Sequence, residues 1–207
     1  MAIVNSVEQS ESPVLLITPD IKTMESLSEE IQFFAGENYE FPVYTFPDWE
    51  VLPYDTFSPY QDITSERIRT LSKIIRLNKG LIITTVATAM SRLMPVSYLT
   101  ARVINFSSGD TLELDHFKNE LVEFGYKAVS QVVEHGEFAF RGSILDLYPM
   151  GRQSPIRIDL FDNIIDSIRK FDPETQKSIT AINEINILPA NELDFSESGI
   201  KQFRQSW

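Results

Sequence analysis

The protein has 207 residues, no cysteine and a formal net charge of −12 at pH 7. The lack of cysteine excludes disulfides, thiolate metal sites and a cysteine nucleophile, and the negative charge disfavours general binding to a phosphate backbone, which depends on Lys and Arg. No apolar run approaches the roughly 18 residues of a membrane span. The first residues, MAIVNSVEQSESPV, lack the basic and apolar segments of a secretory signal, so we expect that they do not form one.

The first half of the chain alternates short apolar runs with amphipathic segments. The run SPVLLITPD has the profile of a buried strand, and apolar residues at helical spacing predict helices between such runs. In chain order we expect a strand at 12–20, a helix at 21–34, a strand at 41–47, an irregular loop at 48–62, a helix at 63–77, a strand at 79–86 and a short helix at 87–94. Strands that alternate with helices favour a parallel sheet.

The second half changes character near residues 102–105. The segment LELDHFKNELVEFGY predicts one helix, capped at Asp110 or Thr111 and ended by Gly125. The other runs are strand-like, and the turns between them are rich in Gly, Pro, Asp and Asn. We expect these strands within 102–110, 128–135, 137–142, 143–149, 155–161, 164–172 and 178–188. The predicted fold class is therefore α/β with a parallel sheet, followed by an α+β domain with a mostly antiparallel sheet.

A search for catalytic motifs finds none. No segment has the glycine-rich loop, ending in Gly-Lys-Ser/Thr, with which an α/β domain cradles the phosphates of a nucleotide. Without that loop we interpret Asp146, in the apolar run SILDL, as an alternating strand residue and not as a magnesium ligand. His116 and His135 lack metal-ligand spacing, and we interpret them as surface or interfacial residues. The loop at 46–60, rich in proline and aromatic residues, could hold a ligand, but its composition favours a packed loop that braces the sheet.

Two strand-like runs of the second half place arginines opposite apolar residues. In PIRIDLF the two isoleucines and the leucine share one face, and Arg157, Asp159 and Phe161 share the other. In EFAFRG both phenylalanines share one face, and Arg141 lies on the other. Because the apolar sets must face the core, Arg141, Arg157 and Phe161 are predicted to face outward. Arginine beside an exposed aromatic ring is typical of a protein interface. On pattern alone, a chance arrangement, or a Phe161 covered by the helix or the neighbouring domain, stays open.

Three sequence blocks resemble a known family. DWEVLPYDTFSPYQDITSERIRTLSKI, EHGEFAFRGSILDLYPMG and IRIDLFDNIIDSIRKFDPETQKSI together resemble the N-terminal module of bacterial transcription-repair coupling factors (Mfd), which is itself similar to the damage-recognition protein UvrB. The resemblance extends from about Pro13 to Pro189. It implies a degenerate helicase-like α/β subdomain at 1–103, a UvrB-like α+β domain at 104–188 and the start of a further subdomain at 189–207.

The resemblance also implies a function. In this family the second domain recruits the excision-repair protein UvrA through an Arg before the Gly of an RG pair, and through an Arg and a Phe in an R-x-D-x-F strand. These positions fall at Arg141, Arg157 and Phe161. The resemblance therefore implies a non-catalytic module that binds UvrA by mimicking UvrB and links stalled RNA polymerase to nucleotide excision repair in the bacterial cytoplasm. It implies no catalytic residue, metal or cofactor here, because family proteins bind ATP, RNA polymerase and DNA through other domains.

Two alternatives accompany this hypothesis. A residual nucleotide- or DNA-binding helicase-like domain would hydrolyse ATP or bind a DNA strand by itself. The missing phosphate loop argues against hydrolysis, and the negative charge argues against DNA binding. So does the absence of UvrB's tyrosine-rich hairpin, because this chain runs directly from SPYQD into a helix. Alternatively, the outward face holds the module against the rest of a longer protein, as the family is thought to do in its resting state.

Overall fold

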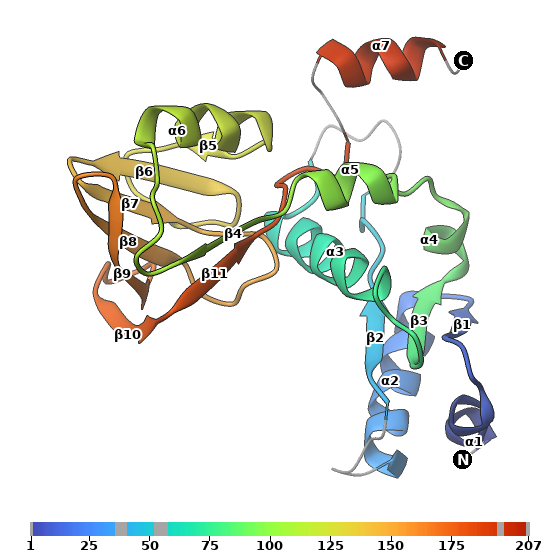
Figure 1. The fold of residues 1–207 in the computed structure, drawn as a ribbon. Helices are drawn as coiled ribbons and strands as arrows, with labels where there is room; N and C mark the ends of the chain where they lie inside the picture. Colours follow the sequence, from blue (N-terminus) through green and yellow to red (C-terminus); the bar gives the residue numbers. More distant parts are fainter. Residues whose placement is uncertain (1, 36–40, 52–57, 194–196, 206–207) are drawn as a thin grey trace. The chain divides into compact units, whose positions relative to one another are not determined.

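The structure is a computed structural model that describes residues 2–35, 41–51, 58–193 and 197–205. The chain forms two compact units, Met1–Leu93 and Met94–Trp207 (Figure 1). The first unit contains a parallel sheet and the second a mostly antiparallel one, which confirms the predicted fold class. The domain boundaries after residues 103 and 188 stay predictions. No helix among the described residues is long and apolar enough to cross a membrane.

The first unit is built on a three-stranded parallel sheet with the strand order β1–β3–β2. Its strands run in one direction because a long connection containing a helix joins each to the next. The elements are α1 (Ala2–Gln9), β1 (Val14–Thr18), α2 (Ile21–Ala35), β2 (Val43–Phe46), α3 (Gln61–Ile74), β3 (Leu81–Thr85) and α4 (Val86–Met90). All but α1 were expected from the sequence pattern.

One side of this sheet is covered and the other is partly open. The covered side packs on α1 and α2, in a cluster that includes Val4, Val7, Met24, Ile31, Leu81 and Ile83. On the other side, Leu15 and Ile17 of β1 are 54% and 49% exposed. The prediction of a buried first strand was therefore wrong for Leu15 and Ile17, whereas Val14 and Leu16 of the same strand pack against the core.

The segment after β2 is fastened to α3 by a buried arginine. Arg67 is fully buried, and its guanidinium lies 4.3 Å from the ring centroid of Phe46 and 4.2 Å from that of Trp49. It also donates a hydrogen bond to the carbonyl oxygen of Pro47. Cation–π contacts and the hydrogen bond replace the water lost on burial. The described part of the loop thus braces the sheet, as its composition favoured, whereas residues 52–57 lie outside the described residues.

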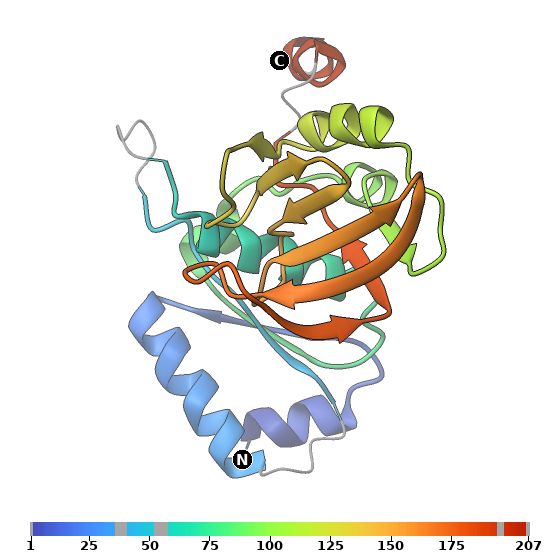
Figure 2. The same ribbon diagram turned by 90° about the vertical axis from the view of Figure 1, so that its left-hand side faces the viewer.

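The second unit is built on a six-stranded sheet with the order β10–β9–β8–β7–β6–β5 (Figure 2). Neighbouring strands are antiparallel except for β5 and β6, which are parallel. Its strands are β5 (Lys127–Ala128), β6 (Glu137–Arg141), β7 (Ile144–Leu147), β8 (Ile156–Phe161), β9 (Ile164–Phe171) and β10 (Ser178–Ile182). The remaining elements are α5 (Val96–Ala101), the paired strands β4 (Ile104–Ser107) and β11 (Glu184–Ile187), α6 (Leu114–Glu123) and α7 (Glu197–Gln205).

Helix α6 begins later than the sequence predicts. It starts at Leu114, and neither predicted capping residue caps it. The carboxylate of Asp110 accepts a hydrogen bond within the turn after β4, and Thr111 forms a β-bridge with Ile164. The predicted cap was therefore wrong, because Thr111 is paired with a strand of the sheet and Asp110 is bonded within a turn. The predicted end is confirmed, since Gly125 follows the helix with a φ of 91°, a conformation that favours glycine.

Two predicted strands are shorter or divided. Of the predicted strand at 128–135 only Ala128 lies in β5, although the N–H of Val129 still donates to the carbonyl oxygen of Phe138 at 2.9 Å. Further along, the Glu137 carboxylate accepts hydrogen bonds from the backbone N–H groups of Val133 and Glu134, each at 2.8 Å, and holds the chain in a turn. The predicted strand at 178–188 divides into β10, which pairs with β9, and β11, which pairs with β4. The composition of these two segments favoured strands, but it carried no information about their pairing partners.

Candidate functional site

The register of β6–β9 lines up side chains in rows on the side of the sheet that carries Arg157, which we call the outer face. The rows contain Phe161 and Ile164; then Arg141, Ile144, Asp159 and Ser167; then Ala139, Asp146, Arg157 and Arg169. Along β8, buried side chains alternate with more exposed ones. The structure therefore brings Arg141, Arg157 and Phe161 together on one face, as strand alternation predicts.

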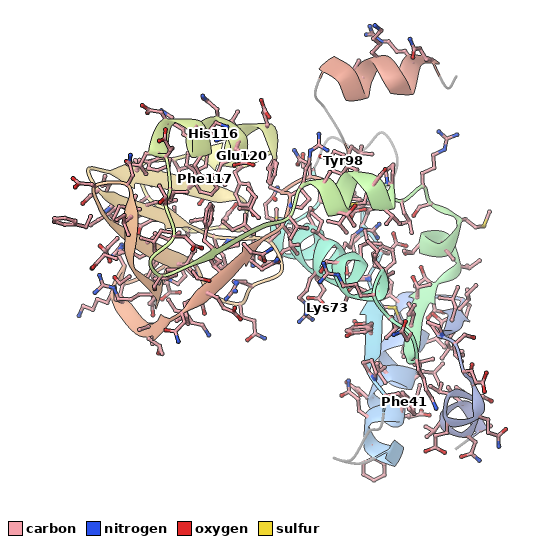
Figure 3. The ribbon with its side chains drawn as sticks, viewed as in Figure 1. Phe41, Lys73, Tyr98, His116, Phe117 and Glu120 are labelled. Atoms are coloured by element: carbon pink, nitrogen blue, oxygen red, sulfur yellow. The ribbon has the colours of Figure 1, made fainter. Side chains whose placement is uncertain are left out.

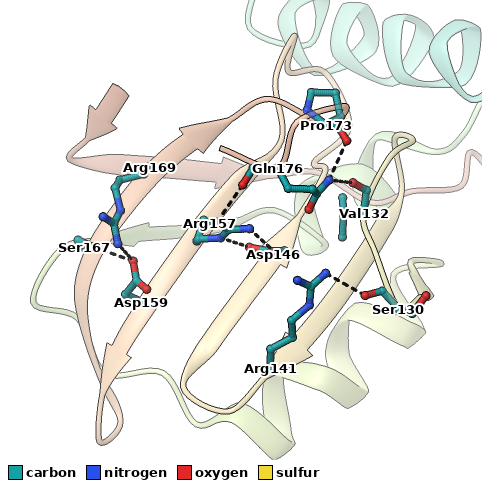
Figure 4. Close-up of polar contacts among 10 residues, drawn as sticks. All are labelled: Ser130, Val132, Arg141, Asp146, Arg157, Asp159, Ser167, Arg169, Pro173 and Gln176. Carbon is teal, nitrogen blue, oxygen red and sulfur yellow. Dashed lines mark hydrogen bonds and ion pairs between the residues drawn. The ribbon is translucent and has the colours of Figure 1, made fainter. Parts of the chain in front are cut away.

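Arg157 is held by an ion pair inside this face (Figure 4). Its Nε donates to Oδ1 of Asp146 at 2.7 Å, and its Nη2 donates to Oδ2 at 2.9 Å. The exposed fraction is only 1% for the Asp146 side chain and 18% for that of Arg157. The hydrogen bonds to Asp146 raise the pKa of the Arg157 guanidinium, while its partial burial acts in the opposite direction. The structure thus gives Asp146 a partner on the neighbouring strand.

A loop and a turn cover the part of the outer face around this pair. Nη1 of Arg157 donates to the carbonyl oxygen of Gln176 at 3.2 Å, and the guanidinium lies 4.9 Å from the ring centroid of Phe171. The Gln176 side chain donates to the carbonyl oxygens of Val132 and Pro173 at 3.0 and 2.7 Å. Val132, Ala139 and Phe171 are buried together as a small core. We call Ala139, Asp146, Arg157 and Phe171 the covered half of the outer face.

The covering turn between β9 and β10 is held by a side-chain carboxylate. Oδ1 of Asp172 accepts hydrogen bonds from the backbone N–H groups of Glu174 and Thr175, at 2.8 and 2.9 Å. These bonds favour the ionised form and lower the pKa of Asp172. The turn presents the carbonyl oxygen of Gln176, whose φ is 60°, to Arg157. The ion pair is therefore part of a network that joins β7, β8 and this turn.

The other part of the outer face is open. Arg141 is exposed, and its Nη2 donates to the carbonyl oxygen of Ser130 at 2.9 Å. Phe161 is 74% exposed and Ile164, its partner across the hairpin, is 50% exposed. We call Arg141, Phe161 and Ile164 the open half. A guanidinium has five N–H donors, so the contact with Ser130 leaves Arg141 able to bind a carboxylate on another molecule.

A second ion pair lies on the same face and was not singled out from the sequence. Oδ2 of Asp159 accepts hydrogen bonds from Nη2 of Arg169 and, at 3.1 Å, from the hydroxyl of Ser167. From the sequence, Asp159 was placed on the same face as Arg157 and Phe161. Its pairing depends on the register of β8 with β9, which contains an irregularity between Asp159 and Leu160. No sequence signal reveals that register.

The two histidines have ordinary structural surroundings. His116 is exposed on α6, beside Phe117 (Figure 3). The ring of Phe117 packs edge-on against that of Phe106, with the two ring centroids 5.2 Å apart. Nε2 of His135 lies 2.7 Å from the carbonyl oxygen of Arg152. Among residues 2–35, 41–51, 58–193 and 197–205, no group of three or more His, Cys, Asp or Glu side chains could hold a metal ion.

Comparison with known families assigns the second unit. Residues 104–193 match the model of the UvrB interaction domain, so this part of the chain belongs to that family. The match includes the whole outer face described above. The matched class is thus an interaction domain. The longer proteins that contain such a domain are found by comparing the whole chain with curated proteins.

The chain is similar to transcription-repair-coupling factors over nearly its whole length. It is 43% identical to that of Haemophilus influenzae over 99% of this chain, 41% identical to that of Escherichia coli over 97%, and 37% identical to that of Staphylococcus aureus (strain Mu50) over 95%. These alignments cover 18%, 17% and 16% of the respective relatives. The chain therefore spans less than a fifth of the length of the curated relatives it matches.

Proposed function

We propose that this chain is a non-catalytic recruitment module of a transcription-repair coupling factor, and that it binds UvrA by mimicking UvrB. It would thereby link RNA polymerase stalled in the bacterial cytoplasm to nucleotide excision repair. In this proposal RNA polymerase, DNA and ATP are bound by other domains of the longer protein, and the chain needs no cofactor. The match of residues 104–193 to the UvrB interaction domain supports a role in UvrA binding.

The observation that carries the proposal is the open half of the outer face. Phe161 and Arg141 are both exposed on one face of a single sheet, within the matched residues. An aromatic ring supplies contact area at a small loss of conformational freedom, and an arginine supplies planar, charge-assisted hydrogen bonds. In the proposed complex, Phe161 buries its ring against UvrA while Arg141 binds a UvrA carboxylate.

Arg157 has a different place in the proposal. Its contacts with Asp146 and Gln176 use three of its five N–H donors. Its first role is to hold the covered half in shape, and its remaining donors are available to a carboxylate of UvrA. The same outer face could also contact other parts of the longer protein before UvrA binds, which would mask the site until it is needed.

The test is a titration of UvrA with the 207-residue chain and with its Phe161→Ala variant. If Phe161 is an interface hot spot, its truncation weakens binding by about 2 kcal/mol or more, which is about 30-fold in Kd. Ile179→Ala is the matched control, because Ile179 lies on the same sheet, in β10, and is 64% exposed. Wild-type affinity of the Phe161→Ala variant, with folding confirmed by circular dichroism, would remove the assignment.

The rival hypothesis, a residual nucleotide- or DNA-binding domain, makes the opposite prediction. It requires ATP hydrolysis or DNA binding by the chain alone. An ATPase assay together with a gel shift on single- and double-stranded DNA separates the two hypotheses. Activity in either assay that is unaffected by Phe161→Ala would favour the rival.

A further inference from the structure

The tip of the β8–β9 hairpin carries two exposed apolar side chains. Phe161 and Ile164 are direct cross-strand partners on either side of a two-residue turn, in which Asp162 has a φ of 54°. Directly opposed side chains in an antiparallel pair have their Cβ atoms about 4.5–5.5 Å apart. Both side chains lie on the outer face, so together they form one apolar patch, to which Ile164 adds area beside the phenylalanine ring.

The backbone of this tip is fixed by a neighbouring segment. The N–H of Gly109 donates to the carbonyl oxygen of Ile165 at 2.8 Å, and the N–H of Ile165 donates to that of Asp110 at 2.9 Å. The N–H of Leu112 donates to the carbonyl oxygen of Asn163 at 2.7 Å. Because Leu112 is itself 2% exposed, the segment is anchored in the core. A braced hairpin loses little conformational freedom on binding, and such preorganisation increases affinity.

Polar side chains surround this apolar patch and do not cover it. Asp159, the next residue of β8 on this face, is already bonded to Arg169 and Ser167. Asp162, Asn163 and Asp166 are exposed at the hairpin. An apolar centre with a polar rim is the usual anatomy of a binding hot spot. A partner that fits this patch must offer an apolar pocket wide enough for two side chains.

We infer that Phe161 and Ile164 act as one apolar anchor, and that Ile164 is a second binding determinant, seated in an apolar pocket of UvrA. This inference rests on the proposed function, because it takes UvrA as the protein that binds the patch. Ile164 is the direct cross-strand partner of Phe161, and Arg141 lies on the same face two strands away from β8, so a partner that contacts Phe161 also reaches Ile164. The contribution of Ile164 is apolar, and therefore insensitive to salt.

The experiment measures UvrA affinity at low and high salt for Ile164→Thr and Ile164→Val. Both substitutions keep the branched Cβ that favours a strand. Removing most of the buried apolar contact in Ile164→Thr weakens binding by about tenfold, and removing one methylene in Ile164→Val weakens it by about fourfold. We expect the same loss at both salt concentrations. The control is Ile179→Thr in β10, for which we expect wild-type affinity.

The outcomes separate this inference from the proposed function. If Ile164→Thr binds UvrA like wild type while Phe161→Ala binds weakly, the inference is wrong and the proposed function stands. If both bind like wild type, both are wrong. If Ile164→Thr instead disrupts self-association of the chain in sedimentation velocity, with unchanged UvrA binding, the patch is a contact between copies and the inference is also wrong. If Ile164→Thr is unstable, the UvrA affinities of Ile164→Val and wild type are compared instead, provided that Ile164→Val melts at the wild-type temperature.

Discussion

The covered and open halves of the outer face contain the same kinds of residue, yet their surroundings differ. Arg157, in the covered half, makes three hydrogen bonds within the protein and its side chain is 18% exposed. Arg141, in the open half, is exposed and donates to one backbone carbonyl. An arginine at an outward strand position can therefore be held by contacts within the protein or left exposed, and the segments that cover it decide which. Substitutions in the two halves should therefore affect different quantities.

The largest expected effect is on stability, in the covered half. Arg157→Ala leaves the carboxylate of Asp146, which is 1% exposed, without its ion-pair partner. Removing one member of a buried pair lowers the free energy of unfolding by about 3–5 kcal/mol. Urea unfolding measures this change. Arg141→Ala is the control and should change stability by less than about 0.5 kcal/mol; equal losses for both variants would contradict the division into two halves.

A double substitution sharpens the role of Arg157. In Arg157→Met with Asp146→Leu, no uncompensated charge remains, so stability should recover by about 2 kcal/mol or more relative to Arg157→Ala. The affinity of this double variant for UvrA then distinguishes two roles of Arg157: holding the outer face in shape and contacting UvrA directly. Near-wild-type affinity means that Arg157 acts by holding the face, whereas a persistent loss means that its remaining donors contact UvrA.

The next effect is on binding, in the open half. Arg141→Ala should weaken UvrA binding by about 1–2 kcal/mol at low salt, because an exposed charge pair contributes modestly. The loss should shrink at high salt, since ions screen exposed charges. Isothermal titration at two salt concentrations tests this. A loss that is independent of salt would contradict a charge-assisted contact.

The smallest expected effect concerns pH and the covering turn. Asp172 has a pKa below its ordinary value of 3.8 in the folded protein. Its ionised form therefore stabilises the fold above that value, and this contribution is lost as pH falls through the lowered pKa. Asp172→Asn should be slightly less stable than wild type at neutral pH, and the difference should vanish in strong acid. Urea unfolding at several pH values checks this; a difference that grows toward low pH would show the opposite linkage.

Part of this structure was predictable because side-chain direction in a strand is local. Period-two alternation in β8 placed Arg157 and Phe161 on one face. It could not show that Ala139, on the same face, is 3% exposed, because Val132 and Phe171 cover it. Alternation assigns a side chain to a face, whereas coverage depends on what other segments place over that face.

The ends of helices and strands were mispredicted for the same reason: they depend on contacts with distant segments. Thr111 looked like a helix cap, but it is bridged to Ile164, far along the chain. The apolar residues within 128–135 suggested a strand, yet Val132 is buried as a cover over the sheet. Local patterns identify which residues are apolar, and cannot identify the surface against which they pack.

The sequence by itself predicted the two fold classes and the faces of the main strands, because these depend on the types and spacing of neighbouring residues. The family resemblance of the sequence implied the positions Arg141, Arg157 and Phe161. Only the tertiary structure decided that Arg157 is bound to Asp146 and Gln176, that Arg141 and Phe161 stay open, and that Ile164 stands beside Phe161. Register and burial arise from contacts between distant segments, and those contacts distinguish Arg157, which is held within the fold, from Arg141, which stays exposed.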